Sequence, residues 1–302
     1  MYLRRLGRVL AKAGNAWIDD HAQSMGAALS YYTVFSIAPL LLIAISVAGL
    51  AFGQDAARGA VVDQLQSLLG QTGAQAIQEL LKNVSRPSSG IVATLVGIVV
   101  LMIGATSVFA ELQDDLNRIW QVPTERKRSS WWAFLRTRIL SIGMIFAMGF
   151  MLLASLAASA AFDAFAAWST SAIAGWEGLA HGVNFVVSFV LTTALFAMIY
   201  RFMPQATIEW RDVGIGALVT AFLFSIGKYL IGLYIGKSAL ASGFGAAGSL
   251  AVLLAWVYYS AQIFLFGAEF TWAYAHAFGS RQDDATGAST ATPTVQPAVR
   301  FR

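Results

Sequence analysis

Three polar residues within one apolar stretch are the first candidates for chemistry. Tyr258, Gln262 and Glu269 are separated by four and seven residues, so they lie on one face of a helix that turns about 100° per residue. An ionisable side chain inside a membrane segment is costly, and it is therefore a functional candidate. The stripe predicts a polar face on which Glu269 gates a path or carries protons, while the other two form hydrogen bonds.

A second polar set lies earlier in the chain and consists of hydroxyl groups. Its members are Ser30, Tyr31, Tyr32, Thr33 and Ser36. Pro39 follows them, and a proline inside a helix frees a backbone carbonyl and favours a kink. The two sets together predict a polar cavity between their helices. The alternative is that these groups only join neighbouring helices through hydrogen bonds.

Two further features are candidates for contact with an anion. Lys228 lies within another apolar stretch, where it either contacts an anionic substrate or extends its ammonium group to the headgroups. Gly243, Gly245 and Gly248 precede the Tyr258 helix. Three glycines so close together predict either a tight hinge turn with exposed backbone amides or a plain flexible turn.

The elements that must position these residues are long apolar helices. Of the 302 residues, 57% are hydrophobic and 12% are charged, whereas soluble domains carry about 25% charged residues. A spanning helix needs about 20 apolar residues. Six such stretches occur, at about 27–52, 90–110, 139–162, 182–203, 213–235 and 249–274. The sequence therefore predicts an all-α, polytopic membrane bundle of six transmembrane helices.

The number of Lys and Arg residues alternates between high and low from loop to loop, and this alternation predicts the orientation of the bundle in the membrane. The N-terminal tail, the loops after the second and fourth stretches, and the C-terminal tail hold fifteen of the twenty Lys and Arg residues. Because Lys and Arg stay on the cytoplasmic side, both termini are predicted there. Span five then runs outward and span six inward, which separates Lys228 from Glu269 by roughly 20 Å in depth. The two are not expected to form a salt bridge.

The connecting segments give three predictions about organisation. Residues 53–89 show two short apolar periodicities on either side of Gly70 and Gly73, which predict an external amphipathic helical hairpin. Residues 111–120 continue span two as an amphipathic helix that Pro123 ends. The chain divides into a cytoplasmic segment 1–26, a membrane domain 27–279 and a disordered cytoplasmic tail 280–302.

Several classes of function are not expected. The chain has no cysteine, its three histidines lie in different segments, and no nucleotide-binding or hydrolase motif occurs. No metal site, cofactor or enzymatic activity is therefore predicted. Glu111, Asp114 and Asp115 are carboxylates that suit Mg²⁺, but their helical setting beside Arg118 favours a solvated or salt-bridged face. The net charge of +4 follows from the cytoplasmic Lys and Arg, so nucleic acid is not an expected partner.

Five motifs of the chain resemble the YihY/virulence factor BrkB family. They are AALSYYTVFSIAP at 27–39, GATSVFAELQDDLNRIW at 104–120, YRFMP at 200–204 with Trp210, GFGAAGSL at 243–250 and WVYYSAQIFLFGAEFT at 256–271. The resemblance covers about residues 10–280. It implies a bacterial inner-membrane protein with six spans, discussed as a transporter linked to envelope integrity or virulence. The family long carried a ribonuclease label, and no settled catalytic residues can be transferred from it.

These observations favour a transporter or lipid flippase-like protein for an amphipathic or anionic substrate, with its site between spans one, five and six. The expected site residues are Tyr31, Tyr32, Ser36, Lys228, Tyr258, Gln262 and Glu269. The second hypothesis is a non-transporting envelope scaffold that docks proteins through its external hairpin and a cytoplasmic motif. That motif comprises Glu111, Asp114, Asn117, Arg118 and Trp120. A membrane ribonuclease is the remote alternative. Membrane lipids and a second copy of the chain are the expected partners.

Overall fold

The computed structural model describes residues 2–59, 61–62, 77–78, 107–123, 143, 176–237 and 246–282. All regular structure in this part is helical. The long helices are α1 (Tyr2–Asp19), α2 (Ala22–Phe52), α6 (Trp176–Phe202), α7 (Trp210–Lys237) and α9 (Ala246–Ala277). A shorter helical segment covers residues 107–119. The prediction of an all-α membrane protein is confirmed.

Three of the described helices contain segments that are long and apolar enough to cross a bilayer. These segments are Phe185–Phe202 in α6, Trp210–Tyr234 in α7 and Leu250–Ala277 in α9. Each overlaps a predicted span, and α2 covers the predicted span at 27–52. Almost all of the predicted spans 90–110 and 139–162 lies outside the described residues, so the total of six remains a prediction.

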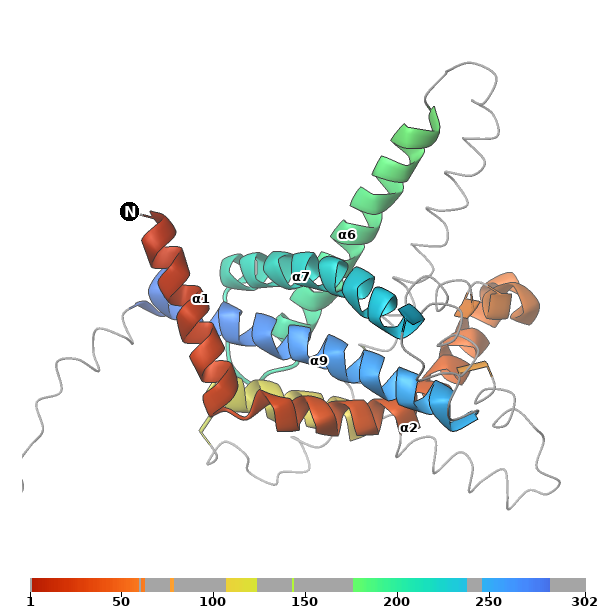
Figure 1. The fold of residues 1–302 in the computed structure, drawn as a ribbon, viewed down its shortest axis with the longest axis horizontal. Helices are drawn as coiled ribbons and strands as arrows, with labels where there is room; N and C mark the ends of the chain where they lie inside the picture. Colours follow the sequence, from red (N-terminus) through yellow and green to blue (C-terminus); the bar gives the residue numbers. More distant parts are fainter. Residues whose placement is uncertain are drawn as a thin grey trace, which may run out of the picture.

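Helix α9 lies at the centre of the described bundle. Helices α1, α2 and α7 pack directly against it, and α6 packs against α7 (Figure 1). Helices α2 and α9 run antiparallel, because Ala22 at the start of α2 meets Gln262, whereas Val34 packs with Leu253 and Val257 earlier in α9. The N-terminal part of α6 extends away from the other helices (Figure 1).

Glycines allow α7 and α9 to approach closely. A methyl group added to Gly216 would collide with Thr271, and one added to Gly267 would collide with Thr220. Small residues at a helix interface let the backbones come together, which is how membrane helices gain packing energy. Gly232 of α7, by contrast, has nothing among the described residues within 4 Å of an added methyl group.

One buried hydroxyl group joins three of these helices. The Tyr200 hydroxyl of α6 donates a hydrogen bond to the Phe264 carbonyl of α9 at 2.7 Å and lies 3.1 Å from Thr220 Oγ1 of α7. Thr220 donates to the Gly216 carbonyl within its own helix. Tyr200 is fully buried, so this contact fixes the depth of α6 relative to α7 and α9.

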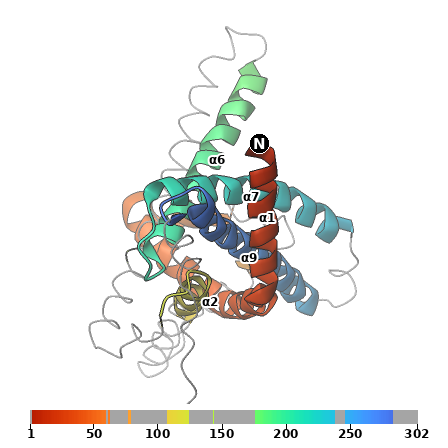
Figure 2. The same cartoon turned by 90° about the vertical axis from the view of Figure 1, so that its left-hand side faces the viewer.

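Helix α1 is an element that the sequence-based prediction leaves out, because residues 1–26 are treated there only as a basic segment. Val9 and Ala13 pack against Phe270 and Ala273 near the end of α9. The N-terminal helix and the C-terminal end of α9 therefore lie at the same end of the bundle, as Figures 1 and 2 show. Lys12 places its ammonium group 4.5 Å from the centre of the Trp272 ring, a favourable cation–π contact.

We call this end of the bundle the basic end. It is formed by α1, residues 107–123, the α6–α7 loop at 203–209 and residues 278–282. These are parts of the four segments in which most Lys and Arg residues of the chain occur. The structure thus gathers at one end the segments that the charge pattern assigns to one side of the membrane.

The opposite end includes the few described residues of the predicted external hairpin. Ala57, Val61 and Ile77 are buried and belong to one apolar cluster with α2 and α9 residues. The remainder of the hairpin lies outside the described residues, as do Gly243, Gly245 and residues 283–302 of the predicted tail. Ser280 and Arg281, by contrast, are described and form hydrogen bonds with the rest of the bundle.

Candidate functional site

The carboxyl groups of Glu269 and Asp212 are the two most deeply buried charged groups described at the basic end. Glu269 is 1% exposed and lies on α9, where it meets the turn between α1 and α2. The Asp20 carboxyl group of that turn is close enough to interact with it through charge. Within the described residues, the Glu269 Oε1 atom has no hydrogen-bond partner.

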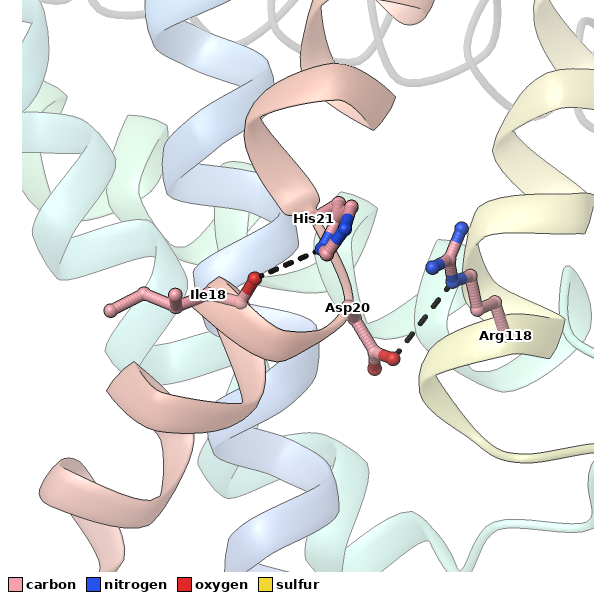
Figure 3. A network of polar contacts seen from close by, with 4 residues as sticks. All are labelled: Ile18, Asp20, His21 and Arg118. Carbon is pink, nitrogen blue, oxygen red and sulfur yellow. Dashed lines mark hydrogen bonds and ion pairs between the residues drawn. The ribbon is translucent and has the colours of Figure 1, made fainter.

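Asp20 also faces a cation. Its Oδ1 atom lies 3.9 Å from Nε of Arg118 in the helical segment 107–119, and Figure 3 shows the two side chains pointing toward each other across the gap between these elements. The side chain of Asp20 is 29% exposed, whereas that of Arg118 is 54% exposed. Asp20 therefore lies between a buried acid on one side and a partly solvated guanidinium on the other.

The turn that holds Asp20 has an unusual backbone. His21 adopts φ 59° and ψ 41°, a left-handed conformation, which costs a residue other than glycine about 1–2 kcal/mol. Its Nδ1 atom lies 3.3 Å from the Ile18 carbonyl (Figure 3), and its own carbonyl accepts the Ser24 N–H at 2.8 Å. The turn ends α1, starts α2 and presents Asp20 to Arg118.

Gln262 lies two turns before Glu269 on α9 and also packs against α2. Its Nε2 atom donates a hydrogen bond to the Ala22 carbonyl at 3.3 Å. A methyl group on Gly26 would collide with the same nitrogen, so glycine makes room for the amide. The Gln262 Oε1 atom has no partner within the described part of the chain. Gln262 and Glu269 thus form one continuous contact with the start of α2 and the turn before it.

The other predicted site residues lie elsewhere. Tyr31 is 57% exposed and stands edge to face with Tyr32, with ring centroids 5.7 Å apart. Tyr258 is also exposed, whereas Ser36 is fully buried. The two tyrosines of α2 and Tyr258 therefore do not share the buried surroundings of Gln262 and Glu269.

Lys228 lies far from Glu269. Its ammonium group is 5.9 Å from the centre of the Phe224 ring, and Phe224 in turn contacts Trp256. Trp256 precedes Glu269 by thirteen residues on α9, which corresponds to about 20 Å along the helix. An ion pair between Lys228 and Glu269 is therefore excluded in this arrangement.

The predicted cytoplasmic motif packs into the bundle. Its helix ends at the turn that precedes Pro123, and Leu116 and Trp120 are buried. Gln113 Nε2 donates to the Met203 carbonyl at 3.0 Å. Asn117 Oδ1 accepts the backbone N–H of Gln205 at 2.7 Å. The motif therefore fastens the end of span two to the α6–α7 loop.

Of the two alternatives expected for this acidic face, solvated or salt-bridged, the solvated one is wrong for Asp115. Asp115 is 6% exposed, because the helix turns this side toward the bundle together with Leu116 and Ile119. Burial raises the pKa of Asp115 to about 7, the negative charges of Glu111 and Asp114 add to the rise, and Arg118 opposes it. Burial and Asp114 also raise the pKa of Glu111.

A second connection at the basic end involves the residues after α9. Asp212 Oδ2 accepts hydrogen bonds from the Ser280 hydroxyl at 2.7 Å and from its backbone N–H at 3.0 Å. The Arg281 guanidinium donates to the Thr207 carbonyl at 3.2 Å and stacks on the Trp120 ring at 5.4 Å. The end of α9, the α6–α7 loop and the cytoplasmic motif are therefore one connected structure.

Asp20, Asp212 and Arg281 are functional candidates that the sequence-based reasoning missed. A usable signal existed for Asp20, since the orientation predicted from the Lys and Arg residues places Asp20 and Glu269 at the same membrane surface. In the described part of the chain, no group of three or more His, Asp and Glu residues is arranged to hold a metal ion. The hinge roles predicted for Pro39 and Gly248 remain predictions, although α2 runs through Pro39 as one helix.

The apolar helices and the polar basic end define an all-α membrane protein. A family model described as virulence factor BrkB matches residues 14–291. The chain belongs to the virulence factor BrkB family. No solved structure matches it.

Named relatives agree with this class. A UPF0761 membrane protein of Ralstonia nicotianae is 28% identical over 274 residues, which cover 88% of this chain and 58% of the relative. A UPF0761 membrane protein of Psychrobacter is 26% identical and shares 85% of this chain but 46% of its own length. The chain thus spans about half the length of these relatives. It covers 87% of a UPF0761 membrane protein of Psychromonas ingrahamii, to which it is 29% identical.

Proposed function

We propose that this chain is a transporter of the bacterial inner membrane that moves an amphipathic or anionic substrate, such as a lipid with an anionic headgroup. The observation that carries the proposal is the buried polar contact of Gln262 and Glu269 with the start of α2 and the turn before it. Ionisable groups within membrane helices are expensive and mark pathways for ions and substrates. In this proposal, Glu269 gates the path or carries protons.

The charge distribution supports an anionic substrate. The basic end presents Arg118 and Arg281 at the ends of the described helices, and Lys228 is a cation within α7. Membrane lipids supply anionic headgroups at the inner surface, where basic residues attract them. Tyr31, Tyr32, Ser36 and Tyr258 are proposed to contact the substrate along α2 and α9. The proposal includes no catalytic step.

Flux in reconstituted vesicles tests this function. The purified chain is placed in vesicles of phosphatidylethanolamine and phosphatidylglycerol that contain fluorescently labelled phosphatidylglycerol, and movement of the label between leaflets is followed. We expect protein-dependent flux that falls at least about tenfold in Glu269→Gln, which corresponds to about 1.4 kcal/mol. Tyr258→Phe is expected to lower flux as well. Glu209→Gln, an exposed acid at the same end, is the matched control. Unchanged flux in both test variants would overturn the proposed path.

A non-transporting envelope scaffold is the second candidate, and the close α7–α9 packing at Gly216 and Gly267 favours it. The chain contains no cysteine, so single cysteines along α2 and α9 can be labelled with a water-soluble maleimide. Labelling along one helical face supports transport. Absence of labelling along both helices, with labelling retained at an exposed control position such as Asn15, supports the scaffold.

A further inference from the structure

We propose that α1 is an interfacial helix, which lies in the headgroup region of the leaflet at the basic end and binds anionic phospholipid headgroups there. Its partner is therefore the lipid surface itself. The inference goes beyond the proposed function, because it assigns a binding role to a helix that the transport path does not use. It holds whether or not the chain moves a substrate.

One side of α1 is apolar although the bundle does not cover it. Leu6 and Leu10 are each 42% exposed, and Ile18 is 59% exposed. Because a helix turns about 100° per residue, these three residues lie within one arc of about 120°. Gly7 and Gly14 fall in the same arc, and a methyl group added to either would have nothing among the described residues within 4 Å. This apolar side therefore has no neighbour in the described part of the chain.

A basic side borders the apolar one. Arg4, Arg8 and Lys12 follow one another at intervals of four residues, so their side chains share one face of the helix. Arg5 lies at the edge of this face, and all four cations are exposed. Helix α1 contains no acid before its last residue, Asp19. Leucine on one side and arginine or lysine on the next is the pattern of helices that lie in the membrane interface.

The third side of α1 fixes its depth along the bundle. Val9 and Ala13 are buried and meet Phe270 and Ala273 of α9. These two residues precede the end of α9 at Ala277 by seven and four positions, which corresponds to about 6–10 Å along the helix. Interfacial helices bury their apolar side about 5–10 Å into the boundary between headgroups and acyl chains. Helix α1 thus lies beside the last turns of a span.

Aromatic residues mark the same level. Trp272 and Tyr274 pack against the cluster that contains Val9 and Ala13, and Trp and Tyr are enriched where a membrane helix passes through the headgroups. The ammonium group of Lys12 lies 4.5 Å from the centre of the Trp272 ring. The polar side of α1 is therefore level with the aromatic residues that are expected at the interface.

The direction of α1 also fits a position in the interface. Helix α1 crosses the end of α9 at a steep angle instead of running alongside it, as both views show (Figures 1 and 2). Since α9 contains a segment that can cross a membrane, a helix that crosses α9 runs closer to the membrane plane than to its normal. The left-handed backbone of His21 lies where the chain changes direction between α1 and α2.

The combination of the two exposed sides selects a lipid surface over a soluble polyanion. A soluble polyanion would pair with Arg4 and Arg8 but would leave Leu6 and Leu10 in water. A membrane that contains anionic lipid covers the leucines with acyl chains and offers phosphate groups to the guanidinium groups at the same time. Each basic residue near such a surface adds to the attraction.

The depth of spin labels tests the position of α1. The chain contains no cysteine, so a nitroxide can be attached to Leu6→Cys, Leu10→Cys or Asn15→Cys in the full-length protein. The first two sites are on the apolar side, and Asn15 is an exposed position on the basic side. The protein is placed in vesicles of phosphatidylethanolamine and phosphatidylglycerol. Paramagnetic resonance then measures collisions with oxygen, which concentrates among acyl chains, and with a nickel chelate, which stays in water.

We expect the ratio of oxygen to nickel collisions to be at least about threefold higher for Leu6→Cys and Leu10→Cys than for Asn15→Cys. Equal ratios at the three sites would place α1 in water and overturn the proposal. Few collisions with either reagent at Leu6→Cys and Leu10→Cys would also overturn it, because a second copy or another segment of the chain would then cover the apolar side.

The role of the arginines has a separate measurement. In the Leu10→Cys protein, Arg4→Gln combined with Arg8→Gln should lower the ratio to about half or less, because two attractions to the surface are lost. Replacement of phosphatidylglycerol by phosphatidylcholine should lower the ratio without the two arginine substitutions and leave it unchanged with them. Arg58→Gln combined with Arg211→Gln removes the same charge from exposed positions outside α1 and is the matched control. A ratio that does not depend on phosphatidylglycerol, or an equal decrease in the control, would overturn headgroup binding by α1.

These results are independent of transport, because the collision ratios require no movement of lipid between leaflets. A high ratio on the apolar side without flux supports the interfacial helix and overturns the proposed function. Flux with equal ratios at the three sites supports the proposed function and overturns the interfacial helix.

Discussion

Asn117 and Gln205 are 88 residues apart in the sequence, yet the Asn117 side-chain oxygen accepts the backbone N–H of Gln205 at 2.7 Å. The bond joins the end of the predicted second span to the loop between α6 and α7. Two membrane segments that are remote in the chain are therefore held at one level by a single buried side chain.

Replacement of Asn117 by alanine should destabilise the protein by about 1–3 kcal/mol, because the partly buried N–H of Gln205 loses its acceptor. Thermal unfolding in detergent measures the effect. Glu209→Ala changes an exposed side chain in the same loop and should leave the unfolding temperature nearly unchanged. Equal unfolding temperatures for Asn117→Ala and the wild type would contradict a stabilising role for the bond.

Two glycine substitutions should have opposite outcomes. Gly267→Ala places a methyl group against Thr220 and Tyr200, and such overpacking costs about 1–3 kcal/mol. Gly232→Ala meets nothing within 4 Å among the described residues and should be neutral or slightly stabilising, since alanine favours the helix over glycine by about 1 kcal/mol. The difference between their unfolding temperatures checks the α7–α9 packing. A larger decrease in unfolding temperature for Gly232→Ala than for Gly267→Ala would refute the close α7–α9 packing.

Stability should depend on pH through Asp115. Its pKa is about 7 in the folded protein and 3.8 in the reference state, so between these values the folded form retains a proton that the unfolded form releases. Stability therefore falls as the pH rises through this window, by roughly 4 kcal/mol in all. Asp115→Asn should remove this dependence, whereas the exposed control Asp55→Asn should retain it. The measurement is thermal unfolding at about pH 4 and about pH 8. Equal wild-type unfolding temperatures at the two pH values would contradict the predicted role of Asp115.

Gly26 and Gln262 should be energetically coupled. Gly26→Ala forces the Gln262 amide away and breaks its hydrogen bond to the Ala22 carbonyl. Gln262→Ala creates space for the added methyl group, so the double variant should lose less stability than the sum of the two single variants. Neighbours of this kind typically show coupling energies of about 0.5–3 kcal/mol. Additive losses would show that the two residues do not share a contact.

The apolar helices could be predicted from the sequence because long hydrophobic runs have few alternatives in a membrane protein. Their ends were predicted several residues short. Helix α7 begins at Trp210 and includes Arg211 and Asp212 in its first turn, and such polar residues end a hydropathy window without ending the helix. Helix α1 was missed, although Leu6, Val9, Ala13 and Trp17 recur at helical spacing.

The sequence did not determine how each helix is rotated about its own axis, and therefore which neighbour each of its faces contacts. The polar stripe of α9 could be identified, but the neighbour that it faces could not, because hydropathy gives the depth of a residue and not its partner. The hydrogen bond of Gln262 to the Ala22 carbonyl and the burial of Asp115 both depend on such rotations. For the same reason, the tyrosines of α2 and α9 shared a predicted depth with Gln262 without sharing its surroundings.

The position of α9 has a consequence for biosynthesis. It is made after the other described helices, yet α1, α2 and α7 all pack against it. At about 5–20 residues per second, α1 leaves the ribosome roughly 10–50 seconds before its docking surface on α9 exists. During this interval, Val9 and Ala13 need a temporary apolar cover, which the lipid surface can supply to an amphipathic helix. Packing of the described bundle is therefore completed late, when insertion of α9 docks segments that were synthesised long before it.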